Sequence, residues 1–173
     1  MDITVLRLGH RPLRDKRLTT HLLLCARALG AGNAIYSGER DRKLEETIEE
    51  VVDQWGGNFR LKYTANYRKA IREWEGKKIH LTMYGYPVEK AVKEIQNYDK
   101  PLLIIVGGPK VPADIYELSD WNISVTTQPH SEVSALAIFL HLLLEGRALI
   151  RDFPDAKIKI TPARDGKDVE YLS

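Results

Sequence analysis

Three short segments combine glycine, proline and polar residues directly after apolar runs that are typical of β-strands. They are residues 81–87 (LTMYGYP), 106–112 (VGGPKVP) and 125–132 (VTTQPHSE). Ligands of open parallel sheets bind beyond the carboxyl ends of the strands, and glycine lets the backbone approach a ligand closely because it carries no Cβ. One such turn would indicate only a tight connection. Three of them favour a site for a nucleotide-like ligand.

The common phosphate-binding loops are missing from the sequence. It contains neither G-x-G-x-x-G nor G-x-x-x-x-G-K-[ST]. The glycine pair at 107–108 is followed by Pro109 and Lys110, without the Ser or Thr of a P-loop. A nucleoside triphosphatase and an ordinary dinucleotide dehydrogenase are therefore disfavoured.

Basic side chains gather near the N-terminus, where eleven positions hold Arg7, His10, Arg11, Arg14, Lys16 and Arg17. A guanidinium group presents a fork of donors that suits phosphate. The alternative is a solvated basic loop balanced by acidic residues elsewhere. Arg27 differs because it follows an apolar run (LLLCA), where a charge needs a partner, a functional cavity or a route to solvent.

Other chemistries find little support in the sequence. The five histidines show no metal-binding spacing, so we expect no metal ion. The single cysteine, Cys25, excludes an intramolecular disulfide and suits a reducing compartment. No Ser–His–Asp order with a nucleophile elbow is present, which leaves a hydrolase unsupported.

Short β-like runs alternate with amphipathic segments along the chain. We expect strands at 3–8, 34–37, 59–63, 78–84, 102–106 and 122–126. We expect helices from Thr19 or Thr20 to Gly30, at 41–55 and 66–75, after Pro87, and up to Leu144. This alternation predicts an α/β fold with a mostly parallel sheet and helices on both faces. Residues 1–150 form one domain in this interpretation, and residues 151–173 a short strand or hairpin extension of it.

The composition limits the class of protein. The chain has 173 residues, 43% of them hydrophobic, which allows a real core, and a formal net charge of only +2 excludes a polycation. The longest apolar runs, 102–106 and 135–144, are too short to span a membrane, so we expect a soluble cytoplasmic protein. The helix at 131–144 is apolar nearly all round. A homodimer would cover its free face, or the sheet and the C-terminal extension would bury it.

Several of these segments resemble the three motifs of the SPOUT superfamily of RNA methyltransferases. They are residues 20–31 (THLLLCARALGA), 104–112 (IIVGGPKVP) and 122–140 (NISVTTQPHSEVSALAIFL). The start LRLGHRPLRDKRLTTH is similar to that of its archaeal tRNA branch, which methylates the ribose 2′-oxygen of cytidine 56. The resemblance implies a deep C-terminal trefoil knot, bound S-adenosylmethionine, a tRNA substrate, and a homodimer whose sites borrow residues from the partner.

The resemblance also implies roles for individual residues. Arg27 would orient or deprotonate the 2′-hydroxyl, with Arg17 and His21 as further catalytic residues, and Arg7, Arg11, Arg14 and Lys16 would bind RNA. The cofactor-binding residues would be Leu81, Thr82, Met83, Gly85, Gly107, Gly108, Pro109, Lys110, Val111, Val125, Thr126, Thr127, Gln128, Pro129, His130, Ser131 and Glu132.

The chain departs from the general ribose-methylating branch at three places. His21 stands at an asparagine position, Pro109-Lys110 replaces a glutamate, and Ser131-Glu132-Val133 keeps only the serine of Ser-Leu-Asn. Other readings therefore stay open: another RNA base or ribose methyltransferase of the superfamily, a non-catalytic RNA-binding protein of the same fold, or a different small-ligand enzyme.

Overall fold

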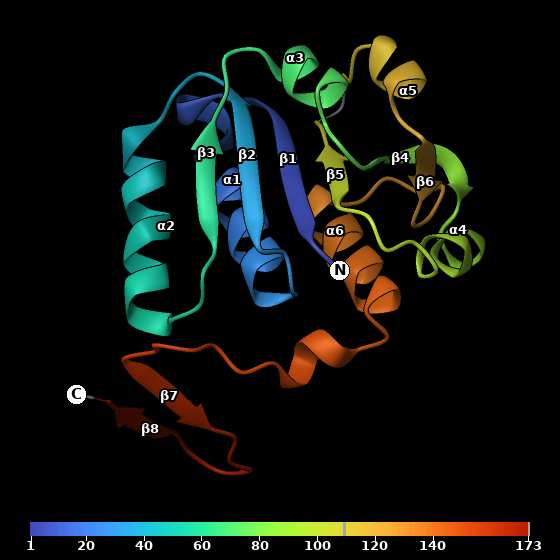
Figure 1. The fold of residues 1–173 in the computed structure, drawn as a ribbon. Coiled ribbons are helices and arrows are strands. Elements are labelled where there is room, and N and C mark those ends of the chain that lie inside the picture. The colour runs from blue at the N-terminus through green and yellow to red at the C-terminus, as the bar shows by residue number, and fades with distance from the viewer. Residues whose placement is uncertain (109, 173) are drawn as a thin grey trace.

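The computed structural model describes residues 1–108 and 110–172, without the side chain of Lys16. Its centre is a six-stranded sheet in the order β3-β2-β1-β5-β4-β6 (Figure 1). The strands are β1 (Ile3–His10), β2 (Asn33–Gly38), β3 (Arg60–Tyr63), β4 (Lys77–Pro87), β5 (Leu102–Val106) and β6 (Trp121–Ser124). Every neighbouring pair is parallel, so all six carboxyl ends meet at one edge of the sheet.

Helices cover both faces of this sheet. The larger core joins one face to α1 (Pro12–Ala28), α2 (Arg42–Trp55), α4 (Val88–Ile95) and α6 (Glu132–Leu143). The smaller core joins the other face to α3 (Tyr67–Arg72) and α5 (Asp114–Leu118). Side chains of β5 enter both cores, which explains its wholly apolar sequence. The predicted parallel α/β sheet with helices on both faces is confirmed.

The N-terminal boundary of α1 was wrongly predicted. The helix begins at Pro12, so the basic run up to Arg17 is helical and not a loop. Proline suits the first helical position, because an N–H group there would have no acceptor within the helix. Thr19 caps nothing, because its hydroxyl is buried against Nδ1 of His10 at 2.9 Å. The short helix α5 was not predicted either.

The length of α1 decides which of its residues can reach the carboxyl edge. It starts directly after β1 and spans 17 residues, which is roughly 25 Å. A connection between parallel strands must return to the opposite edge, so the last turn of α1 lies where the strands begin. The two ends of this helix therefore face different edges of the sheet.

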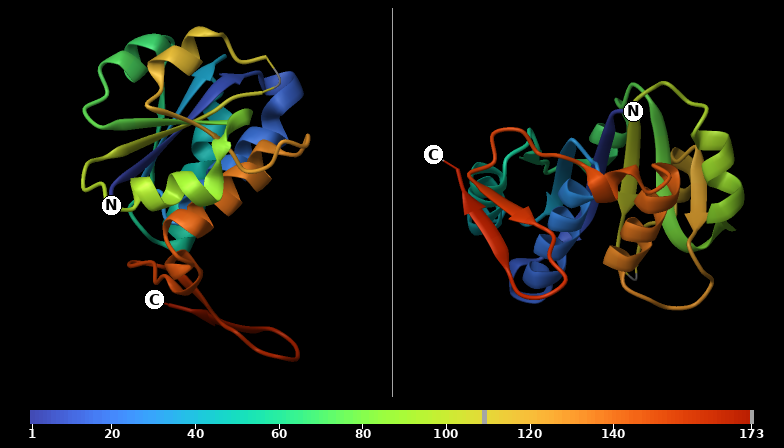
Figure 2. Two further views of the ribbon diagram at one scale, coloured as in Figure 1. Left: turned by 90° about the vertical axis from the view of Figure 1, so that its right-hand side faces the viewer. Right: turned by 90° about the horizontal axis from the view of Figure 1, so that it is seen from below.

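The C-terminal segment forms a separate two-stranded hairpin. After a short 3-10 helix at Arg147–Ile150, β7 (Ile158–Thr161) pairs antiparallel with β8 (Asp168–Tyr171). Figure 2 shows this hairpin extending away from the main sheet. Lys157 anchors it to the end of α2 through Nζ, 2.7 Å from both carboxylate oxygens of Asp53. The hairpin agrees with the predicted strand or hairpin at the C-terminus. The division at residue 150 and the trefoil knot stay predictions.

Candidate active site

A cavity of about 510 Å³ opens at the carboxyl ends of β4, β5 and β6. It is lined by His80, Leu81, Thr82, Met83, Tyr84, Val106, Gly107, Gly108, Val111, Tyr116, Ile123, Val125, Thr126, Gln128, Pro129, His130, Ser131, Glu132 and Ala135. Its size lies within the range of small-molecule sites, ~300–1,000 Å³. The three segments that the sequence singled out therefore converge on one cavity.

Most of the predicted cofactor-binding residues line this cavity. Thirteen of them do so: Leu81, Thr82, Met83, Gly107, Gly108, Val111, Val125, Thr126, Gln128, Pro129, His130, Ser131 and Glu132. Gly85, Lys110 and Thr127 are not among the lining residues, and Pro109 lies outside the described part of the chain. Gly85 has another reason to be glycine, since a Cβ there would lie 2.5 Å from the backbone of Asn122 and Ile123 in β6.

The glycine pair after β5 keeps the cavity open. A Cβ on Gly107 would lie 2.3 Å from Cγ2 of Val111, which is itself a wall of the cavity. A Cβ on Gly108 would lie 3.8 Å from Oε1 of Glu132, so the carboxylate reaches across to this turn. A side chain at either position would occupy space that a ligand could use.

Six lining residues were not among the predicted cofactor-binding residues: His80, Tyr84, Val106, Tyr116, Ile123 and Ala135. Nδ2 of Asn122 donates to the carbonyl oxygen of Tyr116 at 3.0 Å, which leaves its Oδ1 to accept from Nδ1 of His80 at 2.9 Å. Nε2 of His80 therefore carries the lone pair, and it is buried without a partner. Burial lowers the pKa of His80, which keeps the ring neutral. Only the contact with Asn122, 42 residues away, reveals this acceptor.

Arg7 was predicted to bind RNA, but it is not a surface residue. It lies in β1 beside Val106 of β5 and is only 2% exposed. Its Nε and Nη1 are buried without hydrogen-bond partners. Burial lowers the pKa of Arg7, and the carboxylates of Glu132 and Asp15 oppose part of that effect. A buried, incompletely paired guanidinium lies next to the cavity.

The other predicted RNA-binding residues lie at the start of α1. Arg11 and Arg14 are exposed, beside the carboxyl edge of the sheet. Nε of Arg11 donates to Asp15 at 2.9 Å, and this bond holds the pKa of Arg11 above its ordinary value. The prediction for Lys16 concerns a side chain outside the described residues.

Arg17 and His21 lie on the outer face of α1 and do not line the cavity of their own chain. Both are exposed, as is Leu13 with 101% of its reference surface. Spacings of four residues place all three on one stripe of the helix. These three side chains therefore point away from the cavity of their own chain.

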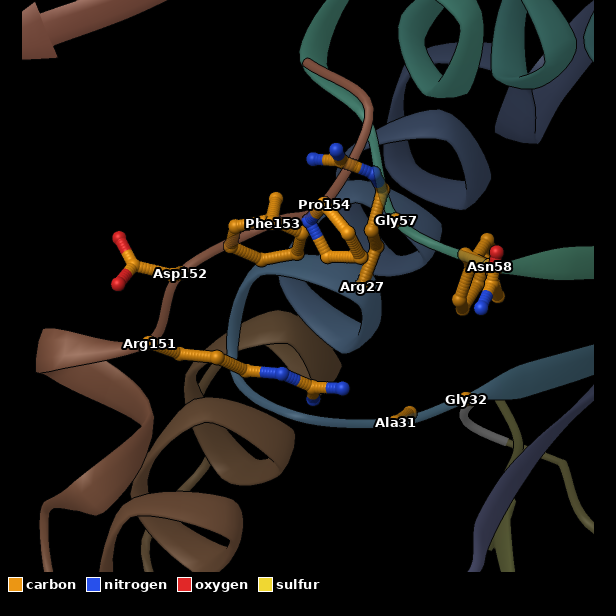
Figure 3. Close-up of a pocket in the computed structure, with 10 residues that line it drawn as sticks. Arg27, Ala31, Gly32, Gly57, Asn58, Arg151, Asp152, Phe153 and Pro154 are labelled. Carbon is orange, nitrogen blue, oxygen red and sulfur yellow. The ribbon is translucent and has the colours of Figure 1, made fainter.

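Arg27 lies in a different pocket, of about 100 Å³, at the amino edge of the sheet (Figure 3). Its Nη2 donates to the carbonyl oxygen of Gly56 at 2.6 Å, and its guanidinium carbon lies 4.5 Å from the centre of the Phe153 ring. Burial lowers the pKa of Arg27, and nearby Arg151 lowers it further. The structure thus does not bring Arg27 to the cavity, because it lies at the far end of α1. Its catalytic role stays a prediction.

Two negative findings apply to residues 1–108 and 110–172. No helix in this part of the chain is long and apolar enough to cross a membrane. No three His, Cys, Asp or Glu side chains gather there as a metal site would require.

Comparisons with known proteins agree with this architecture. Residues 55–170 match the family described as "tRNA ribose 2'-O-methyltransferase, aTrm56". A protein of Methanocaldococcus jannaschii named tRNA (cytidine(56)-2'-O)-methyltransferase is 53% identical over 173 residues, covering 98% of this chain and 96% of its own. One of that name from Methanothermobacter thermautotrophicus is 51% identical over 170 residues, covering 96% and 95%.

Solved structures with low identity share the fold. The TrmH/SpoU tRNA modifying enzyme of A. aeolicus has a TM-score of 0.64 at 15% identity, covering 86% of this chain and 77% of its own. The SpoU methyltransferase AviRb of Streptomyces viridochromogenes, solved with AdoMet, has a TM-score of 0.58 at 15% identity. That match covers 84% of this chain but only 58% of AviRb. On the family match and the relatives near 50% identity, this chain belongs to the aTrm56 family of tRNA ribose 2′-O-methyltransferases.

Proposed function

We propose that this chain transfers a methyl group from S-adenosylmethionine to the ribose 2′-oxygen of cytidine 56 in tRNA. Family membership supports the reaction, and the names of the relatives near 50% identity support the nucleotide. The observation that carries the proposal is the cavity at the carboxyl edge, because two of its three segments lie within stretches that resemble SPOUT motifs. We infer a cytoplasmic enzyme, since tRNA is its substrate.

The cavity suits an adenosyl ligand. Leu81, Val106, Ile123 and Val125 give it apolar walls, and Gly107 and Gly108 expose backbone along one side. The unpaired Nε2 of His80 is an acceptor at the cavity wall, suited to an N–H or O–H group of an adenosine. Bound there, S-adenosylmethionine supplies a methyl group that is activated by its positively charged sulfur.

The protein must bring a weakly nucleophilic ribose hydroxyl to this methyl group. Good alignment contributes up to ~7–11 kcal/mol in well-oriented systems. Arg11 and Arg14 are exposed beside the same edge as the cavity, where they can hold RNA phosphates. In this proposal they fix the position of the RNA chain, and the cavity fixes the donor.

A second copy of the chain completes the site in our proposal. Leu13, Arg17 and His21 form an exposed stripe on α1, and Ile138 of the neighbouring helix α6 is 44% exposed. Apolar side chains among polar ones on adjacent helices are typical of an interface between subunits. We infer a homodimer in which Arg17 and His21 act at the partner's cavity, since neither reaches the cavity of its own chain.

Methyl transfer to unmodified tRNA tests the proposed function. The protein is incubated with labelled S-adenosylmethionine and a tRNA transcript, and the product is digested and mapped by mass spectrometry. We expect one methyl group on the ribose of cytidine 56. Gly107→Val, which fills the cavity, serves as the inactive control. Label on a base would favour another RNA methyltransferase, and no label with intact RNA binding would favour a non-catalytic protein.

A further inference from the structure

The described side chains of the cavity wall include one carboxylate but no lysine or arginine. Among its described lining residues, Glu132 is the only acidic side chain, and no lysine or arginine is present. Burial keeps His80 neutral by lowering its pKa. A cavity whose described wall offers one carboxylate and no lysine or arginine favours a cationic ligand over a neutral one of the same shape.

The carboxylate of Glu132 reaches from one wall of the cavity toward another. The residue begins α6 directly after Ser131, whose hydroxyl accepts from the N–H of Val133 at 3.2 Å and so fixes the helix start. Oε1 of Glu132 lies 3.8 Å from the place of a Cβ on Gly108, at the carboxyl end of β5. The carboxylate therefore lies between two of the three segments that form the cavity.

Arg7 supports this carboxylate from inside the protein. It is 2% exposed and is not among the residues that line the cavity, whereas Glu132 is. The charges of Glu132 and Asp15 both act to raise the pKa of Arg7, and its Nε and Nη1 have no hydrogen-bond partner among the described residues. Arg7 is therefore the buried counter-charge, and the carboxylate is the charge that meets a ligand.

We propose that Glu132 lets the cavity distinguish the methyl donor from the demethylated product by charge. The inference rests on the proposed function, because it assumes that the donor occupies the cavity. S-adenosylmethionine carries one positive charge more than S-adenosylhomocysteine, since transfer of the methyl group converts a sulfonium into a neutral thioether. The carboxylate attracts the donor and loses this attraction once the methyl group has left, which favours exchange of product for fresh donor.

A purely structural role for Glu132 makes a different prediction. An acidic residue in the first turn of a helix is stabilising wherever it lies. Glu89 also lies in the first turn of its helix, as the second residue of α4; it is exposed and is not among the lining residues of the cavity. Glu89→Gln is therefore the matched control for Glu132→Gln.

Isothermal titration calorimetry at low salt tests the inference with three ligands on the full chain. They are S-adenosylmethionine, S-adenosylhomocysteine and sinefungin. In sinefungin, a carbon that bears a positively charged amine stands in place of the methylated sulfur. We expect Glu132→Gln to raise Kd for both cationic ligands about tenfold and to change Kd for S-adenosylhomocysteine less than about twofold. Glu132→Asp should restore part of the difference, and Glu89→Gln should change none of the three values.

The outcomes separate the two proposals. An equal rise in Kd for all three ligands in Glu132→Gln, or no rise for any of them, would overturn the charge-based role. Either result would leave the proposed function intact. Failure of the unaltered protein to bind S-adenosylmethionine at all would overturn the proposed function. Circular dichroism of each variant confirms that the fold is kept, and Glu132→Asp decides the question if Glu132→Gln is misfolded.

Discussion

At the scale of single residues, Arg7 is the side chain that folding alone explains least. A buried guanidinium loses its hydration, and only hydrogen bonds and opposite charges inside the protein offset the free-energy cost of that loss. Nε and Nη1 of Arg7 have no acceptor among the described residues. An apolar side chain in β1 would avoid this cost, and we therefore infer that Arg7 serves the neighbouring cavity rather than the core.

Replacing Arg7 by methionine tests that interpretation. We expect the free energy of unfolding to stay unchanged or to rise by about 1 kcal/mol, because a buried charge is replaced by an apolar chain of similar length. The rate of methyl transfer should fall about tenfold or more, because Glu132 loses its counter-charge. Urea unfolding and initial rates measure the two effects. Arg60→Met, at an exposed position of β3, is the control. A large loss of stability with an unchanged rate would refute the interpretation.

Arg27, predicted to be catalytic, does not line the cavity of its own chain. The residue lies near the end of an apolar helix that closes at Gly30, and an αβ connection returns to the amino edge of the sheet. This geometry was accessible from the sequence. It separates Arg27 from the cavity and leaves it joined to Gly56 and Phe153.

We therefore expect Arg27→Ala to act on stability. The loss of a charged hydrogen bond and of a cation–π contact should lower the free energy of unfolding by about 2 kcal/mol. At temperatures where the variant is folded, kcat should stay within about twofold of the unaltered protein. Denaturation and steady-state kinetics give both values. A collapse of kcat without loss of stability would instead support the predicted catalytic role.

At the scale of elements, helices and strands were predicted best where the spacing of apolar residues and the residue composition indicated the same element. The helix expected at 41–55 is α2 within one residue, and the apolar run at 102–106 is β5. The start of α1 was missed because a run of basic residues looked like a loop. The stripe of α1 that faces the core consists of Leu22, Leu23 and Ala26, all of which come later. The five-residue α5 is too short to show a helical period.

Some features of the cavity could likewise be predicted from the sequence, and others could not. Glycine and proline after apolar strands identified its three segments, because these residue types favour turns wherever they occur. His80 and Arg7 are placed by tertiary structure, through a hydrogen bond with Asn122 in one case and burial beside Val106 of β5 in the other. No local pattern distinguishes such a buried polar residue from an ordinary strand position.

Asp41 couples the start of α2 to the end of β1. Its Oδ1 accepts from the N–H of Leu44 at 3.1 Å and caps α2, while Oδ2 lies 3.3 Å from Nε2 of His10. Burial pushes the pKa of Asp41 upward, but the hydrogen bonds from Leu44 and His10 outweigh it, so the pKa lies below its ordinary value. The ionised form is thus favoured by folding.

This shift predicts a pH dependence of stability. The unfolded carboxyl binds a proton near pH 4, above the folded pKa, so the stabilisation is complete above about pH 4 and is lost as pH falls through the folded pKa. We expect Asp41→Asn, which keeps a good helix-capping residue but removes the charge beside His10, to lower the free energy of unfolding by about 1 kcal/mol at neutral pH. The difference from the unaltered protein should shrink in acid. A constant difference between pH 2 and 7 would show that ionisation is unimportant there.

At the scale of the whole molecule, the proposed homodimer makes a prediction that a monomer cannot share. One protomer carries Arg17→Ala and the other Gly107→Val, so that each variant alone has either a defective outer stripe or a blocked cavity. If Arg17 acts at the partner's cavity, each mixed dimer holds one intact site. An equal mixture, refolded together, should then recover about a quarter of the unaltered activity.

The alternative arrangements give other results in the same experiment. Mixed dimers stay inactive if Arg17 serves the cavity of its own chain. Light scattering of the unaltered protein supplies the companion check, because a monomer at assay concentration would remove the basis of the complementation. Ile138→Lys, which puts a charge on the exposed apolar position of α6, should shift the mass toward the monomer.

The central claim is that the cavity at the carboxyl edge delivers a methyl group to one ribose oxygen of tRNA. Two tRNA transcripts test it most directly, one with 2′-deoxycytidine at position 56 and one with the deoxy sugar at the following nucleotide. With labelled S-adenosylmethionine, the account predicts no transfer to the first transcript and full transfer to the second. Equal labelling of both transcripts would contradict it, because the acceptor would then not be the 2′-oxygen of cytidine 56.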